Sequence, residues 1–549
     1  MANEFGNYNV FDPLDPTPTT TLSDGNRISA ITSSNKNHKT TFAIPLTGKW
    51  SCQIKITTVG GNPMVGLVGD GNSFYAVYRT GGESIVASGS GADASYGDTY
   101  DNSNFIDILY DADADSLAFR RDGEDQGVAF TDVRARCIGP LYFGVRSSTT
   151  STFQLNSGQS AFDTAIKSGY ATLNTANLSE PAIINPDEHY FSSTVVTSTS
   201  SNVTTPVSFD LDDYEWVMVV KNTTSAGSWI WVNSFIGVDK FIRSNGNNAQ
   251  ADLDWLSVSG TTFTISTAIG VNDTVLVEIH KAGLKSASAA NTVGSLNTTE
   301  TSVNATSGFS MGVYEGEGAN ATIGTGLSTA YDFLAVKNLD SGQGWRNWHV
   351  GLTNGTKYAR FDSTAAEATE AATWNSTAPA ATVFSIGTAA NTSQDDHTIL
   401  YFGWHSVEGY SSFGKYNGNG ATDGAVVAFN GHPNSMFFRS QNAGDNWYYH
   451  NSSVNPINPV ITYLAYNIAN ASQSFTSHDR ISTGIKARNA NSGWNFDGIV
   501  LYGAWGIRSL TDGNINQGRA GNQYGFPTIM ALAAGGTITT DGDFKVHVF

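Results

Sequence analysis

Three aspartates at alternate positions, Asp111, Asp113 and Asp115 in the stretch DADAD, form the most suggestive chemical pattern in this chain. Carboxylates at positions 1, 3 and 5 open the calcium loop of an EF-hand, which also needs Gly at position 6 and Glu at position 12. Ser116 and Gly123 stand at those places. The aspartates are therefore a calcium candidate with an incomplete loop. A hairpin turn with acidic residues on a solvated edge is the alternative, and no other metal site is expected.

The residue types of hydrolases and metalloenzymes are present, but not at catalytic spacing. The ten histidines form no His-Glu-x-x-His motif, and the chain has no Gly-x-Ser-x-Gly elbow and no paired-cysteine zinc spacing. The 48 acidic residues offer too many carboxylate pairs for a glycosidase site to be located, because the separation must be measured in space. We expect no enzyme activity, no catalytic residue and no cofactor.

Four aromatic residues are the candidates for ligand binding: Trp345, Trp348, Trp447 and Tyr448. They lie in or beside short β-rich runs that follow turn-rich segments. Exposed aromatic rings stack on the apolar faces of sugars, while Asn-, Asp- and Gly-rich loops supply hydrogen bonds. The same pattern also suits rings that pack in a core, so both interpretations stay open.

Two glycine-rich stretches read alike, GVYEGEGANATIG from Gly312 and GKYNGNGATDGAV from Gly414. A loop that cradles phosphate lies between a strand and a helix. No helical periodicity follows Ala319 or Ala421, which argues against phosphate binding. We expect these glycines to supply turns with positive φ at the start of repeated modules.

The two stretches belong to a repeat. Their tyrosines, Tyr314 and Tyr416, are 102 positions apart. Each repeat also has a basic residue eight positions before a tryptophan. The pairs are Lys221 and Trp229, Lys337 and Trp345, and Arg439 and Trp447. A period near 100 residues predicts tandem domains, since solenoid repeats run about 20–50 residues. Their β-hairpin patterns predict β-sandwiches or jelly rolls, which we expect to lie in a row.

Composition sets the class of the whole chain. Its 549 residues include 29 Lys and Arg and 48 Asp and Glu, a net charge of −19. No basic cluster is present, which argues against nucleic acid as a partner. Short strands rich in β-branched and aromatic residues alternate with Gly, Asn and Asp turns, which predicts an all-β protein. No secretory signal is recognised, and no apolar run approaches about 18 residues, so membrane insertion is not expected.

The first 165 residues have a different signature. The strand GKWSCQIKI from Gly48 is followed by VGLVGDG, by the hairpin DILYDADADSLAFRRDGEDQGVAF and by LYFGVRSSTTSTFQLNSGQSAF from Leu141. This order resembles the SPRY-like domains, concanavalin-A-like sandwiches, of phage tail and other virion proteins. The next stretch, GYATLNTANLSEPAI from Gly169, is similar to the TANLP-P connector that follows such domains, although Ser179 and Glu180 depart from it.

The repeats resemble units found in marine and cyanobacterial phage tail proteins. Those units carry FGxYxGNGxxDG, matched here by FGKYNGNGATDG from Phe413, and a basic strand with a downstream Gly-Asn-Trp, matched by Arg439 and GDNW from Gly444. The end of the chain, AAGGTITTDGDFKVHVF from Ala533, is similar to the start of a glycine-rich tail-fibre element.

This resemblance implies a bacteriophage virion structural protein, a tail fibre or another exposed appendage involved in host attachment and receptor binding. It implies other virion proteins as partners, host cell-surface polysaccharide as a candidate ligand, and a homo-oligomer, for which a trimer would fit. The virion would be its location, after assembly in the host cytoplasm. The alternatives are a head-decoration or capsid-associated structural protein without receptor binding, and a secreted adhesin or lectin.

The expected organisation has seven parts. They are a SPRY-like β-sandwich (1–165), a connector (166–188), repeat module 1 (189–284), a linker (285–307), repeat module 2 (308–408), repeat module 3 (409–511) and a C-terminal tail (512–549).

Overall fold

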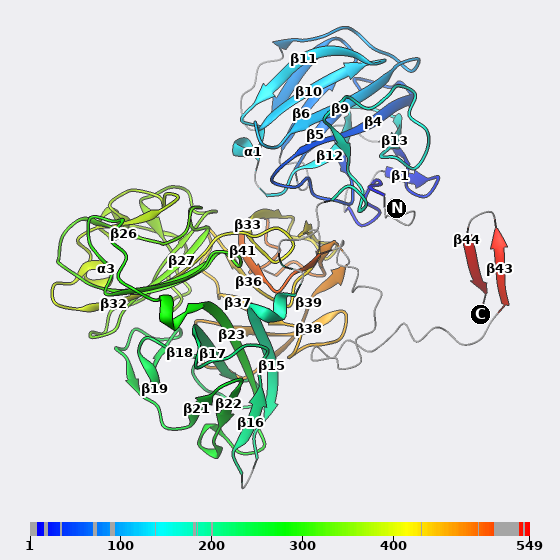
Figure 1. Cartoon of the computed structure of the whole chain (residues 1–549). Helices are drawn as coiled ribbons and strands as arrows, with labels where there is room; N and C mark the ends of the chain where they lie inside the picture. The colour runs from blue at the N-terminus through cyan, green and yellow to red at the C-terminus, as the bar shows by residue number, and fades with distance from the viewer. Residues whose placement is uncertain are drawn as a thin grey trace.

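A computed structural model gives the structure of most of the chain. It describes residues 8–15, 20–32, 36–69, 74–87, 94–137, 139–178, 183, 185–198, 201–429, 431–481, 483–491, 493–509, 537–541 and 544–548. Two bodies stand out in Figure 1, an N-terminal body in blue and cyan and a three-lobed body in green to orange. We call the second body, from residue 185 to residue 509, the three-module domain.

The N-terminal body is a sandwich of two antiparallel sheets. The first sheet follows the order β1 (Thr20–Ser23), β2 (Ile28–Ile31), β13 (Ser151–Asn156), β4 (Lys49–Thr58), β9 (Phe105–Asp111), β10 (Ser116–Arg121) and β11 (Glu124–Thr131), with β14 (Ala171–Thr172) parallel to β4. The second follows β3 (Lys36–Lys39), β12 (Tyr142–Ser147), β5 (Met64–Val68), β6 (Tyr75–Arg79), β7 (Glu83–Ala87) and β8 (Ala94–Ser95). The short helix α1 (Val133–Arg136) follows β11.

The alternation of side chains along β4 explains how this sandwich forms. Trp50, Cys52, Ile54 and Ile56 all point into the core between the two sheets. Successive residues of a strand face opposite sides, so every second residue of this segment is apolar and faces inward. The strand is therefore specified by its own sequence, as predicted.

Each module of the three-module domain is built on the same four strands. In module 1 they are β15 (Tyr190–Val196), β23 (Thr274–Leu284), β17 (Tyr214–Asn222) and β18 (Ile230–Asn233). In module 2 they are β25 (Phe309–Glu315), β32 (Thr398–Trp404), β27 (Phe333–Asn338) and β28 (Arg346–His349). In module 3 they are β33 (Ser411–Gly418), β41 (Gly498–Trp505), β36 (Ser435–Ser440) and β37 (Tyr448–Asn451).

Further strands close each module. Module 1 adds β19 (Gly237–Arg243), β20 (Ala251–Asp252), β16 (Val203–Pro206), β22 (Thr262–Ile265) and β21 (Leu256–Ser259), with the 3₁₀ turns η1 (Pro186–Glu188), η2 (Thr267–Ile269) and η3 (Lys285–Ala287) nearby. Module 2 adds β24 (Glu300–Asn304), β26 (Ala321–Gly324), β31 (Val383–Ile386), β29 (Lys357–Tyr358), β30 (Ala368–Thr369), α2 (Ala371–Trp374) and α3 (Ala390–Ser393). Module 3 adds β34 (Val426–Ala428), β35 (Gly431–His432), β38 (Val460–Ala465), β39 (Gln473–Ile481), β40 (Gly484–Ala487) and β42 (Arg508–Ser509).

The chain is thus an all-β protein of sandwich domains, as the composition predicted. The three α-helices in the described residues have four residues each, and no described helix is long and apolar enough to cross a membrane. Strand β24, which pairs with β25, lies inside the segment expected to be a linker. Near the C-terminus, β43 (Thr537–Asp541) pairs with β44 (Phe544–Val548), and residues 512–536 of the expected tail lie outside the described part.

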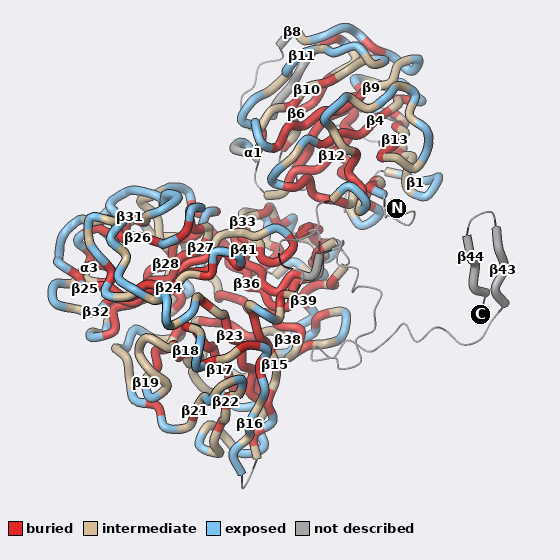
Figure 2. The backbone as a smooth tube through the Cα atoms, viewed as in Figure 1, coloured by how far each residue is buried: buried red, intermediate tan, exposed pale blue. Residues whose placement is uncertain are grey.

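The modules do not lie in a row, which corrects that expectation. Each has an outer core of its own, but all three also share one aromatic-rich core with residues from every module. The strand β17 shows why, because Val217 and Val219 face the shared core while Trp216, Met218 and Val220 face the outer core of module 1. A strand buried on both faces reads as a continuous apolar run, as WVMVV from Trp216 does. Figure 2 shows the buried strands gathered where the modules meet.

The repeated tryptophans join the modules in a closed cycle. In each module the indole Nε1 donates a hydrogen bond to a backbone carbonyl of a different module. The bonds run from Trp229 to Ala465 (2.7 Å), from Trp345 to Arg243 (2.7 Å) and from Trp447 to Arg360 (2.6 Å). Module 1 thus binds module 3, module 2 binds module 1, and module 3 binds module 2. Such a cycle closes only if the modules surround a common axis.

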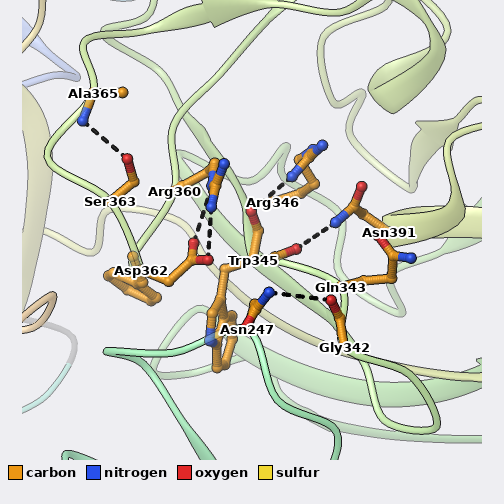
Figure 3. A network of polar contacts seen from close by, with 12 residues as sticks. Asn247, Gly342, Gln343, Trp345, Arg346, Arg360, Asp362, Ser363, Ala365 and Asn391 are labelled. Atoms are coloured by element: carbon orange, nitrogen blue, oxygen red, sulfur yellow. Dashed lines mark hydrogen bonds and ion pairs between the residues drawn. The ribbon is translucent and has the colours of Figure 1, made fainter.

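The repeated basic residues follow the same cycle. Each donates to a carbonyl six residues further along its own module and to a carbonyl of the neighbouring module. Lys221 Nζ reaches Gly227 (2.6 Å) and Ala469 (3.2 Å), Lys337 Nζ reaches Gln343 (2.6 Å) and Asn247 (3.2 Å), and Arg439 Nη1 reaches Asp445 (3.3 Å) and Ser363 (3.3 Å). Figure 3 shows the seam between modules 1 and 2, where Asn247 also donates to Gly342 O beside Trp345.

Three aromatic rings mark the axis. His280, Trp404 and Trp505 occupy equivalent positions, since they pair with the equivalent residues of β17, β27 and β36. Their ring centroids are 5.5, 5.4 and 5.7 Å apart, and each pair meets edge to face. This geometry is favourable for aromatic pairs. The three modules therefore form one domain with approximate threefold symmetry within a single chain.

Each glycine-rich stretch begins in a strand, β25 or β33, and then forms the predicted turn. Gly318 and Gly420 have φ values of +63° and +60°, a region that L residues with a Cβ rarely adopt. A Cβ at Gly316 or Gly418 would lie 2.2 or 2.1 Å from a backbone carbonyl oxygen. The glycines thus serve both a left-handed turn and a close backbone approach.

Candidate functional site

The four aromatic candidates lie in the core. Trp345 and Trp447 are 0% exposed and belong to the core shared by the modules. Trp348 and Tyr448 are each 6% exposed and belong to the outer cores of modules 2 and 3. Rings covered in this way offer no face to a sugar. The structure therefore supports the core interpretation of all four residues.

The three aspartates of the DADAD stretch hold protein groups. Asp111 forms an ion pair with Lys49 (2.7 Å), Asp113 accepts from Gly48 N (3.0 Å), and Asp115 accepts from Arg134 N (2.8 Å). Because the three carboxylates have separate partners, they organise the hairpin and the loops beside it. Across the described residues, no group of three or more His, Cys, Asp or Glu side chains is placed to hold a metal ion.

A cavity of about 430 Å³ lies between the N-terminal sandwich and the three-module domain. The sandwich contributes the segment 43–46 and residues around α1, while modules 2 and 3 contribute the loop after β32 and the first half of β33. Ligand sites of about 300–1,000 Å³ are often found at such domain boundaries. This cavity is the best candidate for a binding site in the described structure.

The two bodies are joined close to the cavity. Lys39 Nζ donates to Val426 O (2.9 Å), and the Tyr142 hydroxyl accepts from Ala428 N (3.3 Å). A small apolar cluster of Ala43, Val68, Tyr142 and Ala428 spans the same boundary. These contacts hold the walls of the cavity in place from both sides.

Charged groups of both signs line the cavity. Arg134 and Lys415 supply the positive charges, and Asp332 and Glu408 the negative ones. Arg134 is fixed by its Nη2, which donates to Pro45 O (2.9 Å), and Asp332 accepts from Ser406 N (2.7 Å). Among the described residues, the Lys415 ammonium and the Glu408 carboxylate make no hydrogen bond or salt bridge.

Burial shifts the titration of three of these groups. It raises the pKa of Asp332 and of Glu408, although nearby Arg134 opposes the shift of Glu408, and it lowers the pKa of Lys415. Glu408 is exposed as a residue, but the surrounding walls still desolvate its carboxyl group. Ionisable groups with perturbed pKa values that meet in one cavity are typical of functional sites.

Apolar side chains complete the walls. Ile44 and Pro45 of the sandwich face Phe413, Phe429 and Tyr502 of module 3. Ser406, Ser411 and Ser412 also line the cavity. Sequence reasoning missed this site entirely, because its lining comes from separate segments of two domains and shares no spacing.

Comparison with known proteins places most of the chain in a family. The fold defines the class of this protein, an all-β domain in which three modules close into a ring. The chain belongs to the family described as "Domain of unknown function (DUF7483)", whose model matches residues 185–506. That range spans all three modules, so the family unit is the whole three-module domain.

Two solved structures are similar to part of the chain. The crystal structure of the SPRY domain of human HERC1 is 19% identical, with 28% of this chain and 99% of that chain covered and a TM-score of 0.22. The crystal structure of a human SPRY domain is 13% identical, covers 26% and 96%, and has a TM-score of 0.20. TM-scores this low do not establish a shared fold. The N-terminal body is therefore assigned as a sandwich from its own two sheets. No curated protein matches the chain.

Proposed function

We propose that the chain is a non-enzymatic structural protein of a bacteriophage virion, located in a tail fibre or another exposed appendage that attaches the particle to its host. The cyclic bonding of the modules supports this proposal most. The buried side chains of Lys221, Lys337 and Arg439 bind backbone carbonyls of the neighbouring module, so these cations hold the modules together. A rigid domain with three outward lobes suits an appendage that bears load and presents several surfaces.

The sequence resemblance supplies the second support. Both the order of segments in residues 1–165 and the FGKYNGNGATDG stretch from Phe413 resemble phage tail proteins. On this proposal the partners are other virion proteins and host cell-surface polysaccharide, and the chain assembles in the host cytoplasm into the virion.

The oligomeric state is a separate part of the proposal. We propose that the chain forms a homo-oligomer, for which a trimer would fit the resemblance to phage appendage proteins. One chain already closes a threefold core, so chains would associate through other surfaces. Light scattering tests this: a single species at the 58.3 kDa of one chain would contradict it.

An adsorption assay tests the attachment role. Virions of the encoding phage are treated with Fab fragments raised against the full chain, and unadsorbed particles are counted over time. The proposal predicts that adsorption slows as the Fab concentration rises, while Fab fragments against a major capsid protein leave it unchanged. Normal adsorption by virions that carry bound Fab would contradict attachment by this chain.

A further inference from the structure

We infer that the cavity between the sandwich and the three-module domain binds a short, uncharged carbohydrate segment. This inference rests on the proposed function, because the host surface would supply the carbohydrate. The site differs from the sequence-based candidates, Trp345, Trp348, Trp447 and Tyr448.

The signs of the charges select the class of ligand. An anionic ligand would face Asp332 and Glu408, and a cationic ligand would face Arg134 and Lys415. A hydroxyl group both donates and accepts hydrogen bonds, so a polyol can pair with carboxylates and with cations in the same cavity. Charge-assisted hydrogen bonds of this kind are about twice as strong as those between neutral groups.

Two ionisable groups have unused hydrogen-bonding capacity. Within the described part of the chain, the Lys415 ammonium donates to no protein acceptor and the Glu408 carboxylate accepts from no protein donor. Both line the cavity. A partly enclosed ionisable group gains from a partner that replaces lost water, and sugar hydroxyls can fill that role.

The rest of the lining also fits a sugar. Phe413, Phe429 and Tyr502 line the cavity only with ring edges, since they are 6%, 7% and 4% exposed, and Ser406, Ser411 and Ser412 line it as well. Sugar rings carry C–H groups as well as hydroxyls, so these apolar edges can contact the C–H groups while the charged groups of the cavity bind the hydroxyls. The volume of about 430 Å³ admits a short segment and excludes a folded domain.

Two cysteines allow the site to be located without a mutation. Cys137 lines the cavity and is half-buried, while Cys52 is 0% exposed in the sandwich core. A ligand in the cavity should slow alkylation of Cys137 by iodoacetamide, and Cys52 should stay unreacted as an internal control.

Saturation-transfer NMR on the purified full chain provides the test. The neutral probes are glucose, galactose, maltose and lactose, and the controls are glucuronate, glucosamine and the zwitterion glycylglycine. We expect at least one neutral probe to bind with a Kd of about 1–10 mM, in the range of weak single sites. It should also slow the alkylation of Cys137 at least about twofold.

Matched variants assign the binding to the cavity. Glu408→Gln and Lys415→Gln should each weaken binding at least about tenfold, as expected when a charge-assisted hydrogen bond is lost. Glu317→Gln and Lys240→Gln, both outside the cavity, should leave it unchanged, and a thermal melt checks that every variant folds.

Three results would overturn the inference: no neutral probe binds, only charged or zwitterionic probes bind, or binding persists in both cavity variants. None of these results would bear on the proposal of a virion protein, which is tested by the adsorption assay and by immunogold labelling of virions. Absence from the virion together with sugar binding would keep the site and reject the proposed function.

Discussion

His349 gives the sharpest test of how the modules are joined. Its Nδ1 accepts a hydrogen bond from Gly351 N (3.0 Å), so the imidazole proton lies on Nε2, which donates to Tyr502 O of module 3 (3.0 Å). The residue is 0% exposed. Burial, and to a smaller extent nearby Lys415, lowers the pKa of His349 from 6.5 to about 4.

The lowered pKa of His349 determines the pH range over which its contribution to stability should change. Because the folded-state pKa of His349 is lowered, its contribution to stability is present above pH 6.5 and is lost as the pH falls towards 4. The gap in pKa corresponds to about 3 kcal/mol, of which about 2 kcal/mol is lost between pH 8 and pH 5. Protonation of Nδ1 would also set an N–H against the N–H of Gly351.

The other modules supply the matched substitution. Asn233 and Asn451 occupy the equivalent positions, and the Oδ1 of each accepts from the backbone N two residues later (3.1 and 2.7 Å), as His349 Nδ1 does. His349→Asn therefore keeps the local turn and removes the titrating group. We expect the free energy of unfolding of the variant to fall about 2 kcal/mol less than that of the wild-type protein between pH 8 and pH 5.

Urea denaturation at the two pH values, followed by tryptophan fluorescence, measures this difference. Of the 12 tryptophans, all except Trp50 lie in the three-module domain, so the signal reports that domain. The same pH dependence in both proteins would refute the assignment of a neutral, buried imidazole at this seam.

Three further substitutions test the seams and the shared core, each by urea denaturation. Lys337→Met should lower stability by about 2 kcal/mol, because the carbonyl groups of Asn247 and Gln343 lose the donor that joins the two modules, whereas Lys240→Met at the surface should leave stability nearly unchanged. Trp447→Phe should lower it by about 2–4 kcal/mol through the lost bond to Arg360 O and the space left; an unchanged midpoint would contradict the bonding cycle. Glu278 is fully buried and its pKa is raised by burial, so its contribution to stability should diminish as the pH rises above 4.5, and the stability of Glu278→Gln relative to the wild-type protein should rise over that range; a relative stability that does not change with pH would contradict this.

The sequence predicted the modules because their local signals repeat. The repeated basic residues lie in the equivalent strands β17, β27 and β36, and the tryptophans eight residues later directly precede β18, β28 and β37. The glycines that follow β25 and β33 form equivalent turns. Turn glycines and alternating apolar residues act through neighbouring residues, so their effect can be recognised without knowledge of the tertiary fold.

The closed arrangement could not be predicted for a physical reason. The tryptophan indoles and the basic side chains bind backbone carbonyls of other modules, as Trp229 binds Ala465 O. Every residue has a carbonyl, so the acceptor leaves no trace in its residue type. The distance along the chain, 236 residues for this pair, adds no local signal either.

The sequence could not decide between the two interpretations of the aromatic candidates for a related reason. A strand buried on both faces and a strand that presents rings to a ligand have the same composition, and only the layer of protein above them separates the two. Trp348 lies under the outer strands of module 2, which its own segment does not reveal. The cavity went unnoticed because Arg134, Asp332, Glu408 and Lys415 come from separate segments of two domains.

Immunogold labelling of intact virions tests the central claim most directly. Antibody raised against the full chain is applied to virions of the phage that encodes it, and gold is located by electron microscopy. The account predicts gold on the tail or its fibres. Gold spread over the head would contradict the appendage assignment, and unlabelled virions that also lack the chain by mass spectrometry would contradict a virion protein altogether.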